Sequence, residues 1–182
     1  MKQAMWRGLA PALLLVALAG CENRSEKAVT QFAISSEAFA NGQAIPAQFS
    51  CDGADKSPPL SWSDPPQGTR SFALVVDDPD APHGTFHHWG AYDIPATLRS
   101  LDAGAGNSPG GAIDAVNDSG NAAYKGPCPP LGNGPHHYHF KLYALDVDRL
   151  SVPANPKITD VENEAQKHLV GRAELIGIYE RR

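Results

Sequence analysis

The sequence is poor in cysteine and in basic residues, and it has no long apolar run. Only three of its 182 residues are cysteine, and 15 lysines and arginines are outnumbered by 20 acidic residues. A membrane-spanning helix needs roughly 20 mostly apolar residues, whereas the run from Leu9 to Leu18 is much shorter and contains Pro11. This run is therefore too short to predict a membrane span.

The charge balance and the missing motifs exclude several functions. The formal net charge is -5, and no basic stretch matches a nucleic-acid backbone, so we expect no nucleic-acid partner. The GxSxG and HExxH motifs, the P-loop and the dinucleotide-binding fingerprint are also absent. The sequence therefore favours a protein that is not an enzyme, with no catalytic residues, no metal site and no cofactor.

The N-terminal residues have the order of an export signal. A short basic region with Lys2 and Arg7 precedes the apolar run, and small residues precede Cys21. The string Leu18-Ala19-Gly20-Cys21 resembles the lipobox of bacterial lipoproteins, in which the cysteine thiol takes a diacylglycerol before cleavage. An ordinary signal peptide with an incidental cysteine is the alternative, and it also gives an exported protein.

This reading divides the chain into three parts. We expect a lipoprotein signal peptide at residues 1–20, a lipidated tether at residues 21–30 and a single domain at residues 31–182. Removal of the first part takes away two basic residues and no acidic one, which moves the net charge from -5 to -7. Glu22 follows the cysteine rather than the Asp that keeps similar lipoproteins at the inner membrane. We therefore favour a lipid anchor on the periplasmic side of the outer membrane.

Turn residues separate short apolar or alternating segments along the chain. There are 17 glycines and 16 prolines. The segments between them predict strands at residues 31–34, 70–77, 88–94, 138–145 and 173–180. One helix is expected at residues 160–170, where Thr159 and Glu162 have capping-box spacing and Gly171 follows the last turn. The fold class is therefore mainly β, a sandwich with peripheral helix.

The residues suited to chemistry gather in three segments near strand ends, where sites are often built. Asp77-Asp78-Pro79-Asp80-Ala81-Pro82 ends one strand, and His87-His88-Trp89 opens the next. The third segment, Gly126-Pro127-Cys128-Pro129-Pro130 followed by Gly134-Pro135-His136-His137-Tyr138, closes a turn-rich stretch at residues 102–137. A loop of that length in a compact domain is usually functional or disordered.

Together these segments resemble the phosphatidylethanolamine-binding protein (PEBP) family, in its bacterial Raf-kinase-inhibitor-like branch. CDGADKSPPLSW at 51–62, YDIP at 92–95, LYALD at 142–146 and the closing HLVGRAELIGIYERR support the resemblance, which runs from about residue 31 to the C-terminus. It implies a β-sandwich of two antiparallel sheets with a small anion-accepting pocket at one end. Carried over by motif, the pocket residues are Asp78, Asp80, Ala81, Pro82, His88, Gly126, Pro129, Pro130, His136 and Tyr138.

The resemblance also implies the ligand and a crosslink. The family's pocket accepts phosphate-like head groups and other small oxyanions, so we expect a small anionic ligand or a phospholipid head group, with the identity of any protein partner open. Cys51 and Cys128 lie in motif segments that the family's fold brings near the pocket. We expect them to form a disulfide, and two buried unpaired cysteines are the alternative.

Strand alternation separates the histidines into two groups. Adjacent His87 and His88 point to opposite faces, and the resemblance selects His88 for the pocket. By the same rule His136 shares a face with Tyr138, while His137 and His139 share the other. We expect Asp78 and Asp80 to orient the two pocket histidines so that their N–H groups meet the anion. The prolines would hold the wall rigid, and Gly126 would let a ligand approach the main chain.

Two departures and two alternatives stand beside the binding hypothesis. His137 stands where the family usually has Arg, so a permanent cation is missing. Phe86 stands near where the family often has Trp. One alternative is a metal-dependent hydrolase, because Asp/His clusters bind hydrolytic metals. Its ligands would be Asp78, Asp80, His88 and His136. The other is a structural lipoprotein with a vestigial pocket.

Overall fold

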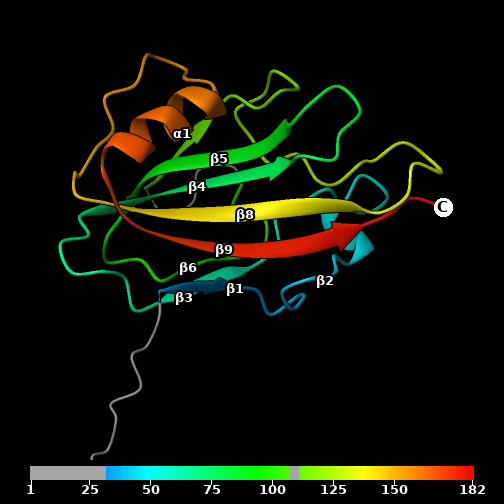
Figure 1. Cartoon of the computed structure of the whole chain (residues 1–182), viewed down its shortest axis with the longest axis horizontal. Coiled ribbons are helices and arrows are strands. Elements are labelled where there is room, and N and C mark those ends of the chain that lie inside the picture. The colour runs from blue at the N-terminus through cyan, green and yellow to red at the C-terminus, as the bar shows by residue number, and fades with distance from the viewer. Residues whose placement is uncertain (1–31, 107–110) are drawn as a thin grey trace, which may run out of the picture.

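The chain forms two packed β-sheets in the computed structural model, which describes residues 32–106 and 111–182. The smaller sheet has the order β1-β3-β6 and the larger the order β2-β9-β8-β4-β5-β7. Figure 1 shows the two layers, with α1 on the outer side of the larger sheet. The expected signal peptide (1–20), Cys21 and the tether (21–30) lie outside the described residues.

The prediction of a mainly β sandwich is confirmed, with one described α-helix and a single 3-10 turn. All strand pairs are antiparallel except β2 with β9, which is parallel. The elements are β1 (Ala33–Ser35), β2 (Gln43–Ala44), η1 (Ala47–Phe49), β3 (Leu60–Ser63), β4 (Ser71–Asp78), β5 (Phe86–Pro95), β6 (Ser100–Leu101), β7 (Ile113–Ala115), β8 (His136–Leu145), α1 (Ile158–Lys167) and β9 (Leu169–Tyr179). No described helix is long and apolar enough to cross a membrane.

The helix differs from its prediction at both ends. It begins at Ile158, whose side chain is buried, and the Asp160 carboxylate accepts the backbone N–H of Lys157 at 3.0 Å. The predicted pair, Thr159 and Glu162, therefore lies inside the helix. The helix ends at Lys167. Gly171, which was expected to follow its last turn, lies in β9 and pairs with Ala144 of β8.

Strand β4 decides how the two faces of the larger sheet are used. It lies between β5 and β8, and all eight of its residues are buried. Phe72, Leu74 and Val76 pack in the core between the sheets, whereas Ala73 and Val75 pack in a second core with α1. The same alternation separates the last two residues, so Asp78 faces the sandwich interior and Asp77 the helix side.

Candidate functional site

A cavity of about 250 Å³ lies at the end of the sandwich where β4 ends and β5 and β8 begin (Figure 1). The turn after β4 and the proline-rich segment before β8 complete its wall. Its lining residues are Asp78, Ala81, Pro82, His83, Phe86, His88, Lys125, Gly126, Cys128, Pro129, Pro130, His136 and Tyr138. Nine of the ten residues expected from the family resemblance are therefore brought together here.

A buried, hydrogen-bonded pair of an aspartate and a histidine forms one side of this cavity. The side chains of Asp78 and His136 are only 4% and 2% exposed, and His136 Nδ1 lies 2.7 Å from an Asp78 carboxylate oxygen. The other ring nitrogen of His136 lies 2.9 Å from the Asn133 side-chain amide. Asp78 thus orients His136 as predicted, but both ring nitrogens have protein partners and neither is free for a ligand.

Asp80 is the predicted pocket residue that does not line the cavity. Its carboxylate accepts the backbone N–H of His137 at 2.9 Å and lies 2.7 Å from His137 Nδ1. The hydrogen bond from the His137 ring lowers the pKa of Asp80. Because His137 alternates away from the cavity along β8, it draws Asp80 to the surface. The expectation that Asp80 orients a pocket histidine is therefore wrong, and it orients His137 instead.

His88 faces the cavity from a bulge in β5. Val76 pairs with Trp89 and Asp77 with His87, which leaves His88 as the extra residue. His88 Nδ1 lies 2.7 Å from the backbone carbonyl oxygen of Lys125, and this carbonyl accepts only from a protonated Nδ1. Burial lowers the pKa of His88. When the ring is neutral, its proton is therefore on Nδ1 and its lone pair is on Nε2.

Tyr138 places a buried hydroxyl beside His88. The residue is 1% exposed, its ring is 5.2 Å from the His88 ring, and its hydroxyl has no hydrogen bond of normal geometry in the described chain, although the Asp78 carboxylate and the Cys128 backbone N–H lie close to it. Burial raises the pKa of Tyr138, and the negative charge of Asp78 adds to the effect. A neutral, unpaired hydroxyl in a buried site is costly, so this atom points to a missing partner.

The proline-rich wall is held from the side of η1. Cys128 forms a disulfide with Cys51, the pairing that the sequence analysis expects. The Gly126 N–H donates to Asp55 at 2.7 Å, and a Cβ at Gly126 would lie 2.4 Å from the carbonyl oxygen of Phe49. Glycine is therefore required for the contact between two chain segments, and the approach of a ligand to Gly126 stays a prediction.

The residue motifs did not identify two charged or titratable side chains at the cavity. His83 lies on the turn after β4, and Lys125 lies on the segment before β8. The Lys125 ammonium is 3.3 Å from Asp55, so it is partly neutralised. Neither residue belongs to a recognisable motif. Each is next to a motif segment in the sequence, and this position was the only feature that could have indicated a place at the cavity.

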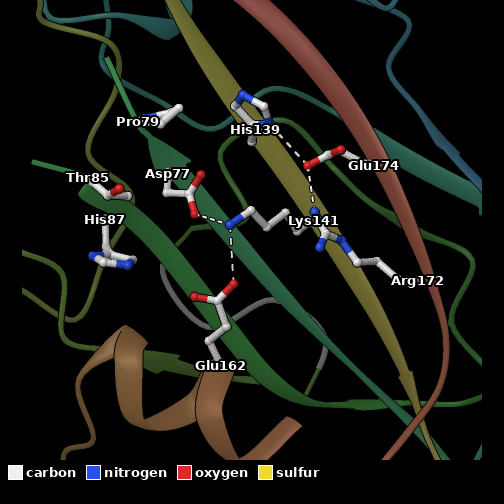
Figure 2. Close-up of a pocket in the computed structure, with 9 residues that line it drawn as sticks. All are labelled: Asp77, Pro79, Thr85, His87, His139, Lys141, Glu162, Arg172 and Glu174. Carbon is white, nitrogen blue, oxygen red and sulfur yellow. Dashed lines mark hydrogen bonds and ion pairs between the residues drawn. The ribbon is translucent and has the colours of Figure 1, made fainter. Parts of the chain in front are cut away.

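A second group of charged residues lies on the opposite face of the sheet, beside α1. Figure 2 shows the Lys141 ammonium between the carboxylates of Asp77 and Glu162, with His87 near them. The Tyr143 hydroxyl donates to Glu162 at 2.6 Å, and His87 Nδ1 lies 2.9 Å from Asp118. His87 and His88 therefore lie on opposite faces as expected, with His88, the residue that the family resemblance selects, at the cavity.

The structure does not favour the hydrolase alternative. Of its four ligands, Asp80 bonds to His137 and His88 to a carbonyl, so they do not converge on one point. Within the described ranges, the group with suitably close ligand atoms is Asp77, His87 and Glu162, all within 4.8 Å of one another. The Lys141 ammonium already neutralises the two carboxylates there, and the group ties α1 to the sheet.

Comparison with known proteins agrees with this architecture. The sequence profile described as phosphatidylethanolamine-binding protein matches residues 35–180. A protein of Aquifex aeolicus called UPF0098 protein is 45% identical over 150 residues, covering 81% of this chain and 88% of its own length.

Two crystal structures share the fold. Escherichia coli YbcL, described as a new member of the mammalian PEBP family, superposes with a TM-score of 0.80 at 35% identity, over 84% of this chain and all of its own. A putative PEBP homologue from Chlamydia trachomatis gives 0.75 at 36% identity, over 83% and 98%. The two sheets are thus those of a PEBP-like binding protein. The chain belongs to the phosphatidylethanolamine-binding protein family.

Proposed function

We propose that this protein binds small phosphate-like anions in the cavity between β4, β5 and β8. The observation that carries the proposal is the buried Tyr138 hydroxyl, which has no hydrogen bond of normal geometry in the described chain and lies beside the His88 ring at the cavity. Ligand pockets typically enclose about 300 to 1,000 Å³, and this cavity holds about 250 Å³. A head group fits that space, whereas a whole diacyl lipid does not.

The location of the protein is the second part of the proposal. We propose that it is a lipoprotein of the Raf-kinase-inhibitor-like branch, anchored in the cell envelope through a lipid on Cys21. The cavity would then bind its anion close to a membrane surface. This placement rests on the LAGC string and on the short apolar run before it.

Titration of O-phosphoethanolamine by calorimetry or NMR tests the binding site. Replacing Tyr138 with Phe or His88 with Ala removes one ligand hydrogen bond each. A hydrogen bond to a charged group contributes about 1.5 to 3 kcal/mol, so affinity should fall roughly 10-fold to more than 100-fold.

His87→Ala is the matched control, because His87 lies on the opposite face of the same strand and should leave affinity unchanged. Equal weakening by His87→Ala and His88→Ala would contradict the assignment of the cavity. His136→Ala is a poor probe of binding, because it leaves the buried Asp78 carboxylate without its partner.

A further inference from the structure

The loop before β8 contains an asparagine followed by a glycine, Asn133 and Gly134. In such a pair the backbone nitrogen of the glycine can attack the side-chain carbonyl carbon of the asparagine, because glycine has no Cβ to obstruct the approach. The bond to the side-chain nitrogen breaks, and ammonia leaves with the proton of the glycine N–H, which reaches it through water. The product is a five-membered succinimide, and water then opens it to aspartate or isoaspartate.

The backbone nitrogen of Gly134 is free to react. No described residue accepts its N–H, and its φ of 84° is the left-handed conformation of a turn. Asn133 is exposed, and its backbone N–H donates to the Pro130 carbonyl at 3.1 Å, a bond that does not involve the reacting atoms. The Asn133 side-chain amide has one partner, His136 Nε2 at 2.9 Å. The attacking nitrogen is therefore unrestrained, and a single hydrogen bond holds the side chain.

The other asparagine–glycine pair of the chain, Asn41 and Gly42, is held at both reacting groups. The Gly42 N–H donates to the Ile176 carbonyl at 2.7 Å, and the Ile176 N–H donates to the Asn41 side-chain oxygen at 2.8 Å. Both bonds must break before the Gly42 nitrogen reaches the Asn41 side-chain carbon. We expect this requirement to slow the reaction about tenfold or more relative to the pair with the free nitrogen.

The side chain of Asn133 contacts the buried pair at the cavity. His136 Nδ1 donates to Asp78 at 2.7 Å, so in the neutral ring Nε2 has the lone pair and accepts from the Asn133 amide. A carboxylate at position 133 has no N–H to give to this lone pair. It also adds a negative charge beside a cavity that Lys125 and His83 line. Deamidation therefore changes both the hydrogen bond that orients His136 and the charge that an anionic ligand meets.

We propose that Asn133 is a site of spontaneous deamidation, and that this modification lowers the affinity of the cavity for anions as the protein ages. The loss of affinity rests on the proposed function of the same cavity, whereas the reaction itself does not. A unit charge several ångströms from the ligand, in a partly solvated site, changes affinity by about threefold to tenfold.

Peptide mapping by mass spectrometry measures the reaction in wild-type protein incubated at pH 7.5 and 37 °C. Asn133 should convert at least about tenfold faster than Asn41 in the folded protein. In guanidinium chloride the two sites should convert at similar rates, because the same dipeptide is then free of tertiary contacts. Similar rates in the folded protein, or faster conversion of Asn41, would overturn the proposal. So would a folded rate at Asn133 below about one tenth of its unfolded rate, because the loop would then protect the site.

Titration of O-phosphoethanolamine at pH 7.5 measures the effect on binding. Asn133→Asp should bind about threefold to tenfold more weakly than the wild type. Asn133→Gln is the matched control, because it keeps a neutral amide and removes the reactive pair, and it should bind more tightly than Asn133→Asp. Equal weakening in the two variants, or unchanged affinity in Asn133→Asp, would overturn the link between the modification and the cavity.

The two experiments separate this inference from the proposed function. Absence of O-phosphoethanolamine binding by the wild-type protein would overturn the proposed function and the effect on affinity together. Peptide mapping would still decide whether Asn133 is the modification site. Rapid conversion of Asn133 with weaker binding by Asn133→Asp supports the whole proposal.

Discussion

At the residue scale, two adjacent histidines serve two different surfaces. The bulge at His88 turns that ring into the cavity, while His87 joins the charged group beside α1. His88 differs from an ordinary surface histidine because its burial favours the neutral ring. The neutral form of this ring is therefore favoured more than in an ordinary surface histidine, and in that form Nε2 is a hydrogen-bond acceptor.

Burial of His88 predicts a pH dependence of stability in the ligand-free protein. The folded pKa of His88 lies below its unfolded value of about 6.5, so the unfolded chain binds the proton more readily. Stability from this group is complete above pH 6.5 and is lost as pH falls toward the folded pKa, by at most about 1.4 kcal/mol per pH unit. Denaturant unfolding at pH 7.5, 6.5 and 5.5 measures it.

The control for this prediction is the non-titrating variant His88→Gln. Its free energy of unfolding should fall less between pH 6.5 and 5.5 than that of the wild type, because one proton-uptake site has been removed. An identical pH profile in the two proteins would mean that His88 is protonated equally readily in the folded and unfolded chains.

At the element scale, an ionic bridge holds α1 against the larger sheet. Lys141 on β8 contacts Asp77 on β4 and Glu162 on α1, and the Asp77 side chain is 3% exposed. Burial raises the pKa of Asp77 despite the Lys141 charge. The Asp77 carboxylate therefore needs the Lys141 ammonium beside it, because a buried charge without a partner would cost more free energy.

Lys141→Met should destabilise the protein by roughly 3 to 5 kcal/mol, because it leaves a buried carboxylate without its partner. The double variant Asp77→Asn with Lys141→Met should recover much of this loss. Urea unfolding measures both. Arg70→Ala, which removes an exposed ion pair with Asp148, is the control and should change little. Equal effects of Lys141→Met and Arg70→Ala would show that the bridge is not structural.

The sequence predicted the long strands and, of the short ones, only β1, which was expected at residues 31–34 and spans Ala33–Ser35. The other short strands were missed for a physical reason. Strands β4, β5, β8 and β9 have eight or more residues each, and their apolar patterns are clear. Strands β2 and β6 have two residues each, and no periodicity can be recognised at that length. The helix was found from its apolar face, but its start was misplaced because several polar residues offered similar capping patterns.

At the scale of the whole molecule, the cavity could be foreseen because its parts lie in recognisable segments. Nine of its lining residues followed from the family resemblance, and strand alternation placed the histidines on the correct faces. The partners of these residues could not be foreseen. Whether Asp80 faces a ligand or His137, and whether His88 bonds to a carboxylate or a carbonyl, depends on contacts between distant segments.

The proposed N-terminal anchor gives a prediction for the intact protein in cells. Cys21→Ser should abolish lipid attachment and leave the chain uncleaved or soluble, because the thiol is the proposed acceptor of the diacylglycerol. Membrane fractionation with detergent extraction, together with mass spectrometry of the N-terminus, measures the result. A variant that is still processed and still fractionates with membranes would contradict the lipoprotein proposal.

The edges of the larger sheet affect how the protein behaves at high local concentration. Its outermost strands, β2 and β7, have two and three residues, whereas the long strands lie between them. An exposed strand edge is a template for pairing with another chain. Strand β2 covers only Gly177 and Ile178 of β9, and β7 covers only Gly90 to Tyr92 of β5. The rest of the outer edge of each long strand has no strand partner among the described residues, so these two stretches are where a second copy would pair.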